Sequence, residues 1–253
     1  IIYAATFALA IGLGAFGGLF ELRDMPDQPV LVASTDGVGT KTMVAAELDR
    51  VDGLGHDIVN HCLNDILVQG ARPLFFLDYI ASSRLSPQLI SRVISGAAEA
   101  CRAAGMPLLG GETAEMPGVY RTGELDLVGT IIGIVGRADI IDGSAIRDGD
   151  IVVALESGGL QTNGFSLSRA ALDGRYSDPL DPAYPDGPTV GDALLVPHRP
   201  YTSAIRPLLD RGLAHGLAHI TGGGIPGNLV RVLPAGLQAM TLLRPQDEHF
   251  MDL

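Results

Sequence analysis

The stretch Asp57-Ile-Val-Asn-His-Cys-Leu-Asn-Asp-Ile-Leu-Val-Gln-Gly-Ala-Arg-Pro-Leu-Phe-Phe-Leu-Asp-Tyr-Ile80 decides the fold of this 253-residue chain. Its first half repeats apolar residues at helical spacing up to Gln69, and Gly70 is suited to end a helix. The apolar run Leu74–Ile80 then predicts a buried strand that Asp78 interrupts. A helix followed directly by a buried strand is typical of a mixed α/β protein.

Strand and helix patterns alternate on both sides of this stretch. A turn around 142–144 separates two parts, and we expect two mixed α/β domains, an α+β arrangement, over residues 1–143 and 144–253. The expected strands are Val30–Ser34, Pro107–Leu109, Leu125–Val135, Ile151–Leu155 and Leu217–Ile220. The expected helices cover about 40–48, 86–104, Tyr201–Arg211, a segment after Gly164 and one from about Gly227.

The composition limits the possible functions. The 17 Lys and Arg against 29 Asp and Glu give a net charge of −12, so a general nucleic-acid binder is not expected. The two cysteines, Cys62 and Cys101, lie in apolar helical patterns, and we expect buried free thiols. Glycines interrupt the apolar stretch 1–20, which therefore does not predict a membrane span. We expect a soluble, cytoplasmic protein.

The string Thr35-Asp-Gly-Val-Gly-Thr-Lys41 combines a carboxylate, glycines and a lysine where a strand meets a helix. Gly37 and Gly39 let backbone N–H groups approach phosphate oxygens, with Thr40 beside them. Asp36 is suited to bind a metal, and Lys41 supplies a positive charge. The string is not a Walker A loop, and a plain strand–turn–helix connection would look similar.

Asp57, His61, Asn64 and Asp65 fall on one face of the expected helix. Such a polar stripe is either the solvated side of the helix or part of a site. The buried strand that follows favours a site, and Mg²⁺ prefers oxygen ligands. Asp65 is the first candidate ligand there, with Asn64 beside it.

Two further glycine-rich strings carry polar groups. In Gly110-Gly-Glu-Thr-Ala-Glu-Met-Pro-Gly118, residues Gly111, Glu112 and Glu115 form either part of a metal and nucleotide site or an exposed acidic loop. In the second part, Thr221, Gly222, Gly223 and Gly224 precede a helix, as a phosphate-binding turn would. His219, just before them, is either a titrating group or a structural histidine, and Asn163 is a candidate hydrogen-bonding group.

These strings, together with Asp65-x₄-Gly70-Ala-x-Pro73, resemble in combination the phosphoribosylformylglycinamidine cyclo-ligases, from about Gly12 to Ala239. The resemblance implies ATP-dependent closure of formylglycinamidine ribonucleotide to aminoimidazole ribonucleotide in purine biosynthesis, by phosphorylation of the formyl oxygen. It also implies Mg²⁺–ATP binding by Asp36, Asp65 and Glu112, with help from Lys41 and Glu115. Asn163, Thr221 and the Gly222–Gly224 turn would hold the substrate. A homodimer joined through a shared β-barrel is implied as well.

The chain departs from the family pattern at Gln161, where relatives commonly carry a histidine, and Gln161 is retained as a substrate-binding candidate. The likeness stops after Ala239, so residues 240–253 are assigned no role. Two alternatives remain. One is another ATP-using enzyme of the same superfamily, such as a small-molecule kinase or a selenophosphate synthetase. The other is a nucleotide-binding dimer without catalytic activity.

Overall fold

The computed structural model describes residues 10–13, 16–178, 181–183 and 187–239. Its centre is a four-stranded sheet in the order β3 (Pro29–Gly37), β6 (Leu125–Gly136), β4 (Arg72–Ser82) and β5 (Leu108–Glu115). Strand β6 runs antiparallel to β3 and β4, whereas β4 and β5 are parallel. The helix α3 (Pro87–Ala103) makes the crossover between the two parallel strands. The expected mixed α/β fold is confirmed.

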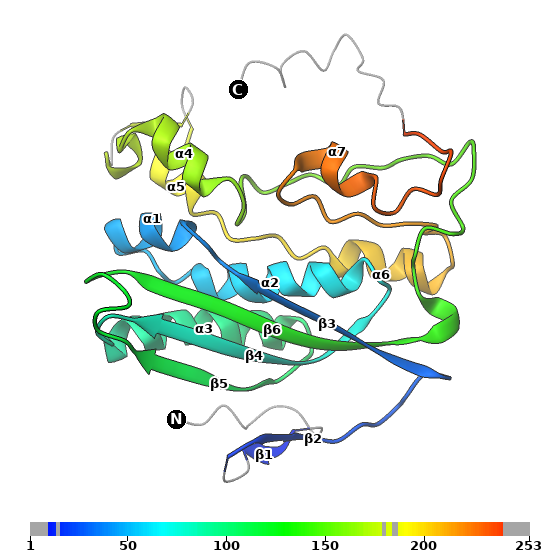
Figure 1. The fold of residues 1–253 in the computed structure, drawn as a ribbon, viewed down its shortest axis with the longest axis horizontal. Coiled ribbons are helices and arrows are strands. Elements are labelled where there is room, and N and C mark those ends of the chain that lie inside the picture. Colours follow the sequence, from blue (N-terminus) through cyan, green and yellow to red (C-terminus); the bar gives the residue numbers. More distant parts are fainter. Residues whose placement is uncertain (1–9, 14–15, 179–180, 184–186, 240–253) are drawn as a thin grey trace.

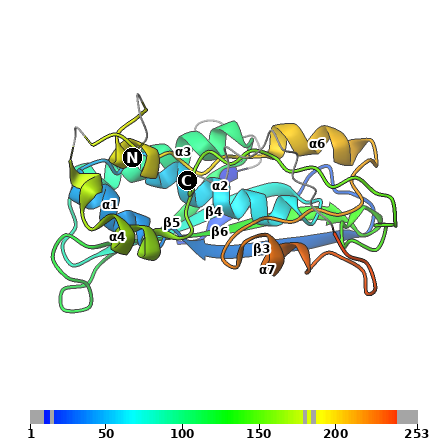
Figure 2. The ribbon, with the colours of Figure 1, turned by 90° about the horizontal axis from the view of Figure 1, so that it is seen from above.

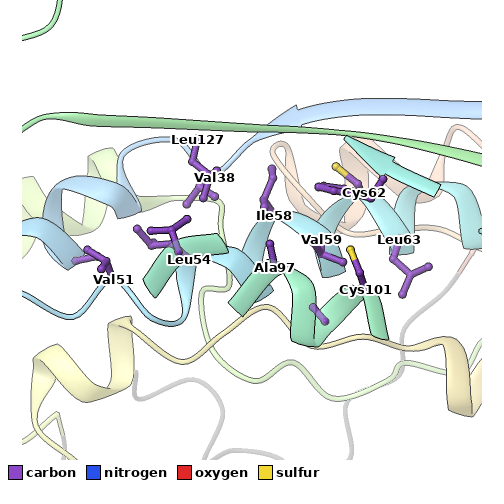
Figure 3. Close-up of a cluster of buried hydrophobic side chains, with 14 of the residues drawn as sticks. Val38, Val51, Leu54, Ile58, Val59, Cys62, Leu63, Ala97, Cys101 and Leu127 are labelled. Carbon is purple, nitrogen blue, oxygen red and sulfur yellow. The ribbon is translucent and has the colours of Figure 1, made fainter. Parts of the chain in front are cut away.

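One face of the sheet carries the core. Helices α2 (Leu54–Leu67) and α3 cover it, and Figure 3 shows Ile58, Val59 and Cys62 of α2 packed with Ala97 and Cys101 of α3. Both cysteines are buried and free, as expected.

Glycine sets the distance between the two helices. A Cβ on Gly55 would lie 2.2 Å from the Val93 carbonyl oxygen and 2.2 Å from the Ala97 nitrogen. Only a residue without a side chain permits this backbone contact.

The opposite face of the sheet is less covered. The short hairpin of β1 (Ala10–Leu13) and β2 (Gly18–Phe20) lies at this side, and the ring of Phe20 is 5.2 Å from that of Phe75. Leu31 of β3 remains 62% exposed. Part of this face is therefore an apolar surface that no described residue covers.

Figure 1 shows most of the second part of the chain above α1 (Lys41–Glu47) and α2, and Figure 2 looks down on this layer. Short helices and extended segments make up this layer. Its helices are α4 (Phe165–Leu172), α5 (Val190–Leu194), α6 (Thr202–Asp210) and α7 (Gly224–Leu229), with a 3₁₀ turn at Arg175–Ser177; another 3₁₀ turn, Arg137–Asp139, follows β6 in the first part.

Four predictions about elements are wrong. Ile151–Leu155 and Leu217–Ile220 are extended but not strands, because no described segment pairs with them, and Ile151 is 88% exposed. The string Gly111–Glu115 belongs to β5 and is not a loop. The last helix begins at Gly224 rather than near Gly227, because Gly223 takes a left-handed conformation at φ +92°. Among the described residues, no helix is long and apolar enough to cross a bilayer.

Candidate functional site

The polar stripe of α2 is buried under the second part of the chain. Asp57 is 0%, Asn64 2% and His61 3% exposed. In place of water, Asp57 and Asn64 hydrogen-bond with the backbone of residues 198–201, and His61 contacts Thr162. The solvated-side interpretation of the stripe is therefore wrong, and the stripe joins the two parts of the protein.

A buried ion pair lies at the start of the stripe. Lys41 Nζ lies 2.8 Å from Asp57 Oδ1 and donates a hydrogen bond to the Val196 carbonyl at 2.7 Å. The His198 backbone N–H donates to the same Asp57 oxygen. Burial raises the pKa of Asp57 to about 6 and lowers the pKa of Lys41. Lys41 is thus committed to packing, and a phosphate contact would require this pair to break.

Asn64 has a similar structural role. Its Nδ2 donates to the Arg199 carbonyl at 2.8 Å, and its Oδ1 accepts from the Tyr201 backbone N–H at 3.1 Å. Both ends of the amide are occupied by the segment 199–201. The Asn64 amide therefore binds the protein backbone and is not available for the nucleotide contact expected from the sequence.

Asp36 begins a chain of hydrogen-bonded groups. Its Oδ2 lies 2.8 Å from His61 Nε2, and His61 Nδ1 lies 2.6 Å from Thr162 Oγ1. Thr162 Oγ1 lies in turn 3.2 Å from His198 Nδ1. One consistent assignment has His61 donating from both nitrogens and Thr162 donating to a neutral His198.

Electrostatics agree with this assignment. Burial works against a charge on His61, but the hydrogen bond to Asp36 and the nearby carboxylates outweigh it and raise its pKa. The same hydrogen bond lowers the pKa of Asp36. Burial lowers the pKa of His198 to about 2, so this imidazole is neutral at pH 7.

Asp65 connects α2 to β3 and to the second part. Its Oδ2 accepts from Ser34 Oγ at 2.7 Å, and its Oδ1 lies 2.8 Å from His219 Nδ1. Asp65 Oδ2 is also 3.9 Å from His61 Nε2, the nitrogen that Asp36 contacts. Asp36, Asp65 and His219, from three separate sequence strings, therefore meet around one imidazole.

The two carboxylates fit a hard divalent cation. Asp36 and Asp65 approach the same nitrogen from two elements, and their side chains are 46% and 25% exposed. Their open side leaves room for the waters and phosphate oxygens that Mg²⁺ usually retains. The chemistry of these two donors suits Mg²⁺, and their role as its ligands stays a prediction.

Glu112 does not join this group within one chain. Across the sheet, Asp36 of β3 lies opposite Gly129 of β6, Gly129 lies opposite Asp78 of β4, and Asp78 lies opposite Gly111 of β5. Three strand spacings therefore separate Asp36 from the neighbourhood of Glu112, about 14 Å in all. Glu115, farther along β5, accepts a hydrogen bond from the Leu85 backbone. The structure therefore does not bring the carboxylates of Asp36, Asp65 and Glu112 together within a single chain.

The remaining residues of the Asp36 string lie next to it. The Gly37 N–H donates to Asp36 Oδ1 at 2.7 Å, so this amide already has a partner. Gly39 has φ +71° with open space around its Cα, and Thr40 Oγ1 is 3.1 Å from Ser166 Oγ. The turn before α1 is thus open on one side and contacts α4 on the other.

The turn Thr221–Gly224 lies directly after His219. Asn228 of α7 fixes this turn, because its Nδ2 donates hydrogen bonds to the carbonyls of Thr221, Gly222 and Gly224. Gly222, Gly223 and Gly224 are exposed. Asn163 approaches this turn, since a Cβ on Gly222 would lie 3.8 Å from its Oδ1.

Gln161 has a left-handed backbone at φ +60°. Its Nε2 donates to Ser157 Oγ and to the Tyr201 hydroxyl, whereas its Oε1 is buried without a protein partner among the described residues. An amide in this position can hydrogen-bond but cannot exchange a proton near neutral pH.

The sequence predicts no functional role for His198 or for His61 on its own. The three rings of His61, His198 and His219 pack with centroids 5.0–5.4 Å apart. His61 already shared the helical face of Asp65, which was a usable signal. No spacing rule connects His198 to that face, because 137 positions separate it from His61 in the sequence.

Comparisons with known proteins identify the family. The chain matches the family model of the AIR synthase related protein, N-terminal domain, over residues 17–135, and that of the C-terminal domain over 147–251. The phosphoribosylformylglycinamidine cyclo-ligase of Anaeromyxobacter dehalogenans (strain 2CP-C) is 52% identical over 90% of this chain and 67% of that protein. The protein with the same name from Desulfitobacterium hafniense (strain DSM 10664 / DCB-2) is 49% identical over 89% of this chain and 66% of that protein.

Solved structures share the fold. Thiamine-monophosphate kinase from Stenotrophomonas maltophilia K279a aligns with a TM-score of 0.56 and 22% identity, over 88% of this chain and 65% of that chain. T. maritima PurL complexed with AMPPCP aligns with a TM-score of 0.50 and 17% identity, over 83% of this chain and 30% of that chain. The present chain spans about two thirds of the length of the curated relatives that it matches. On the strength of its close sequence relatives, this chain belongs to the phosphoribosylformylglycinamidine cyclo-ligase family.

Proposed function

We propose that the protein closes the imidazole ring of formylglycinamidine ribonucleotide, converting it with ATP to aminoimidazole ribonucleotide, ADP and phosphate. The observation that carries this proposal is the meeting of Asp36, Asp65 and His219 in one site. Relatives about 50% identical to this chain bear the name of that activity. The proposed reaction belongs to purine biosynthesis, which supports a cytoplasmic location.

In this proposal Asp36 and Asp65 bind the Mg²⁺–ATP complex. The cation, when bound, neutralises charge on the phosphate oxygens. His61 holds a proton at Nε2 against Asp36 and fixes the orientation of that carboxylate. Positioning and charge neutralisation are the main contributions that a protein makes to phosphoryl transfer.

The substrate would lie against the second part of the chain. The exposed turn Gly222–Gly224 follows His219, which itself contacts Asp65. A ribonucleotide phosphate on this turn is therefore close to the carboxylates that would hold ATP. Asn163 supplies an amide group beside the turn, and two residues earlier Gln161 Oε1 has no partner among the described residues and would accept from a substrate N–H.

We further propose that two chains associate through the uncovered face of the sheet. Leu31 is 62% exposed there, and Phe75, Leu77, Val128 and Ile132 are only half-buried. An apolar surface of this kind marks an association site. Glu112 pairs with Tyr79 on the same face, so a dimer would place Glu112 at the interface, where the family resemblance expects a shared ATP site. The shared barrel and the division at residue 143 are parts of this proposal.

The decisive experiment measures ADP release by the full-length protein with Mg²⁺–ATP, with and without formylglycinamidine ribonucleotide. We expect substrate-dependent ADP release with an equal amount of aminoimidazole ribonucleotide. Asp65→Asn should lose most of this activity, whereas Asp192→Asn, a matched change at an exposed ion pair, should not. ADP release that ignores this substrate would favour another ATP-using enzyme of the superfamily. Nucleotide binding without turnover would favour an inactive binding protein.

The dimer is tested separately by sedimentation. Leu31→Glu places a charge in the proposed apolar interface, and we expect it to convert a dimer to a monomer. Leu167→Glu is the control, because Leu167 is 76% exposed on α4, far from the sheet. A monomeric wild-type protein, or equal effects of both substitutions, would contradict the proposed interface.

A further inference from the structure

Two histidines and a carboxylate form a cluster whose chemistry differs from that of a magnesium site. His61 and Asp65 come from α2 and His219 from the second part of the chain. One ligand atom from each lies within 4.8 Å of the other two. Mg²⁺ prefers oxygen atoms, whereas imidazole suits zinc, copper and nickel.

We infer that His61, Asp65 and His219 form a binding site for a first-row transition-metal dication, with Zn²⁺ as the representative ion. Zinc bonds of about 2.0–2.1 Å to nitrogen and oxygen place tetrahedral ligands roughly 3.3 Å apart. Asp65 Oδ1 is already 2.8 Å from His219 Nδ1, and Asp65 Oδ2 is 3.9 Å from His61 Nε2. The third pair, His61 and His219, lies within the same 4.8 Å, so modest side-chain movements would close the set. The ion would replace the proton that His61 Nε2 holds against Asp36, 2.8 Å away.

Groups behind the ligands hold them in place. His61 contacts Thr162 Oγ1 through Nδ1, the nitrogen facing away from Asp65, at 2.6 Å. Asp65 accepts a hydrogen bond from Ser34 Oγ at 2.7 Å. Outer hydrogen bonds of this kind orient metal-binding histidines and carboxylates in known sites.

A third imidazole stands next to the cluster. The ring of His198 packs 5.0 Å from that of His61 and 5.4 Å from that of His219. Its Nε2 is buried and has no protein partner among the described residues, and the residue is 2% exposed. Three histidines with one unused nitrogen next to a carboxylate make the neighbourhood rich in nitrogen donors.

The site spans the two parts of the chain, and binding would therefore have two effects. An ion held by α2 and His219 would fasten the second part to the first and raise the stability of the folded protein. It would also occupy Asp65, and on the proposed function it would compete with Mg²⁺–ATP. The first effect does not depend on the proposed function.

Co²⁺ is the probe, used with the full chain in the absence of nucleotide and substrate. We expect one ion per chain at micromolar concentration or below, an intense visible band typical of four-coordinate Co²⁺, and displacement by Zn²⁺ but not by an equal amount of Mg²⁺. His219→Asn should weaken binding at least about tenfold, as loss of even an outer partner does in known sites. It should also abolish the rise in melting temperature that Zn²⁺ causes.

His215→Asn is the matched control. His215 forms a histidine–aspartate pair with Asp150 at 2.7 Å, and among the described residues its ring contacts no other histidine. We expect this variant to bind Co²⁺ as the wild type does. Equal loss in both variants, a weak band typical of six-coordinate Co²⁺, or displacement by Mg²⁺ would overturn the inference. Should His219→Asn fail to fold, the wild-type protein still decides: an intense four-coordinate band that Mg²⁺ leaves unchanged supports the site, and a weak band or displacement by Mg²⁺ overturns it.

Discussion

Replacing Lys41 by Met tests whether this lysine serves the packing of the protein or the binding of phosphate. The side chains of Lys41 and Asp57 are 1% and 0% exposed, so the substitution leaves a carboxylate buried without its counter-charge. Breaking a buried pair in this way costs about 3–5 kcal/mol of unfolding free energy. For a protein of this size, that corresponds to a fall in melting temperature of roughly 6–20 °C.

A second substitution should restore part of the loss. Asn at position 57 is neutral, and its side-chain oxygen still accepts from the His198 backbone N–H. We therefore expect Lys41→Met/Asp57→Asn to recover at least about half of the lost free energy, because no unpaired charge remains buried. Urea unfolding of the wild type, both single variants and the double variant gives the coupling energy.

The control is an exposed ion pair of similar length. Arg50 and Asp192 are 2.6 Å apart with side chains 47% and 44% exposed, and Arg50→Met should cost no more than about 1 kcal/mol. The reasoning is refuted if Lys41→Met costs as little as Arg50→Met while ATP affinity collapses. That outcome would show that the ammonium group acts on phosphate.

Three further predictions concern stability. His198 is neutral in the folded protein, where its pKa is about 2, below its unfolded value near 6.5. The unfolded state therefore takes up a proton first, and the stability of the folded protein decreases as the pH is lowered. Relative to His198→Gln, the wild type should lose about 1.4 kcal/mol per pH unit below pH 6 in urea titrations; a constant difference would show that His198 is not buried and neutral. Gly55→Ala should lower the free energy of unfolding by several kcal/mol, because its Cβ would strike the backbone of α3. Gly227→Ala, in open space, should cost less than roughly 0.5 kcal/mol. Equal melting temperatures of the two variants would contradict the close contact between the helices. Asn64→Ala should free the segment 199–201 and make it a site of limited proteolysis, and an unchanged digestion pattern would contradict its fastening role.

Local patterns were sufficient for most of the first part. The helix and strand of Asp57–Ile80 follow from apolar spacing alone, and α2 and β4 occupy these positions. The pattern does not contain strand partners, and for that reason Ile151–Leu155 was wrongly expected to be a strand. Hydrogen bonds between strands are made with distant residues, which local propensity does not report.

In the candidate site, too, local motifs predict some of the residues, and only the fold shows which of them lie together. Asp36 and Asp65 were chosen from their motifs, and both lie around His61. Glu112 belongs to an equally good motif, but β6 and β4 separate its strand from that of Asp36. Only the strand order reveals this separation, because motif strings carry no information on the distance between them.

The sequence by itself determined the family, the mixed α/β class and the carboxylates suited to a cation, since residue type and spacing express these properties directly. The tertiary structure decided what each polar side chain of α2 contacts. It buried Lys41 against Asp57, assigned Asn64 to the segment 199–201, and brought His198 and His219 to His61. Packing partners far apart in the chain set the burial and charge of a group, and the function of an ionisable residue depends on both.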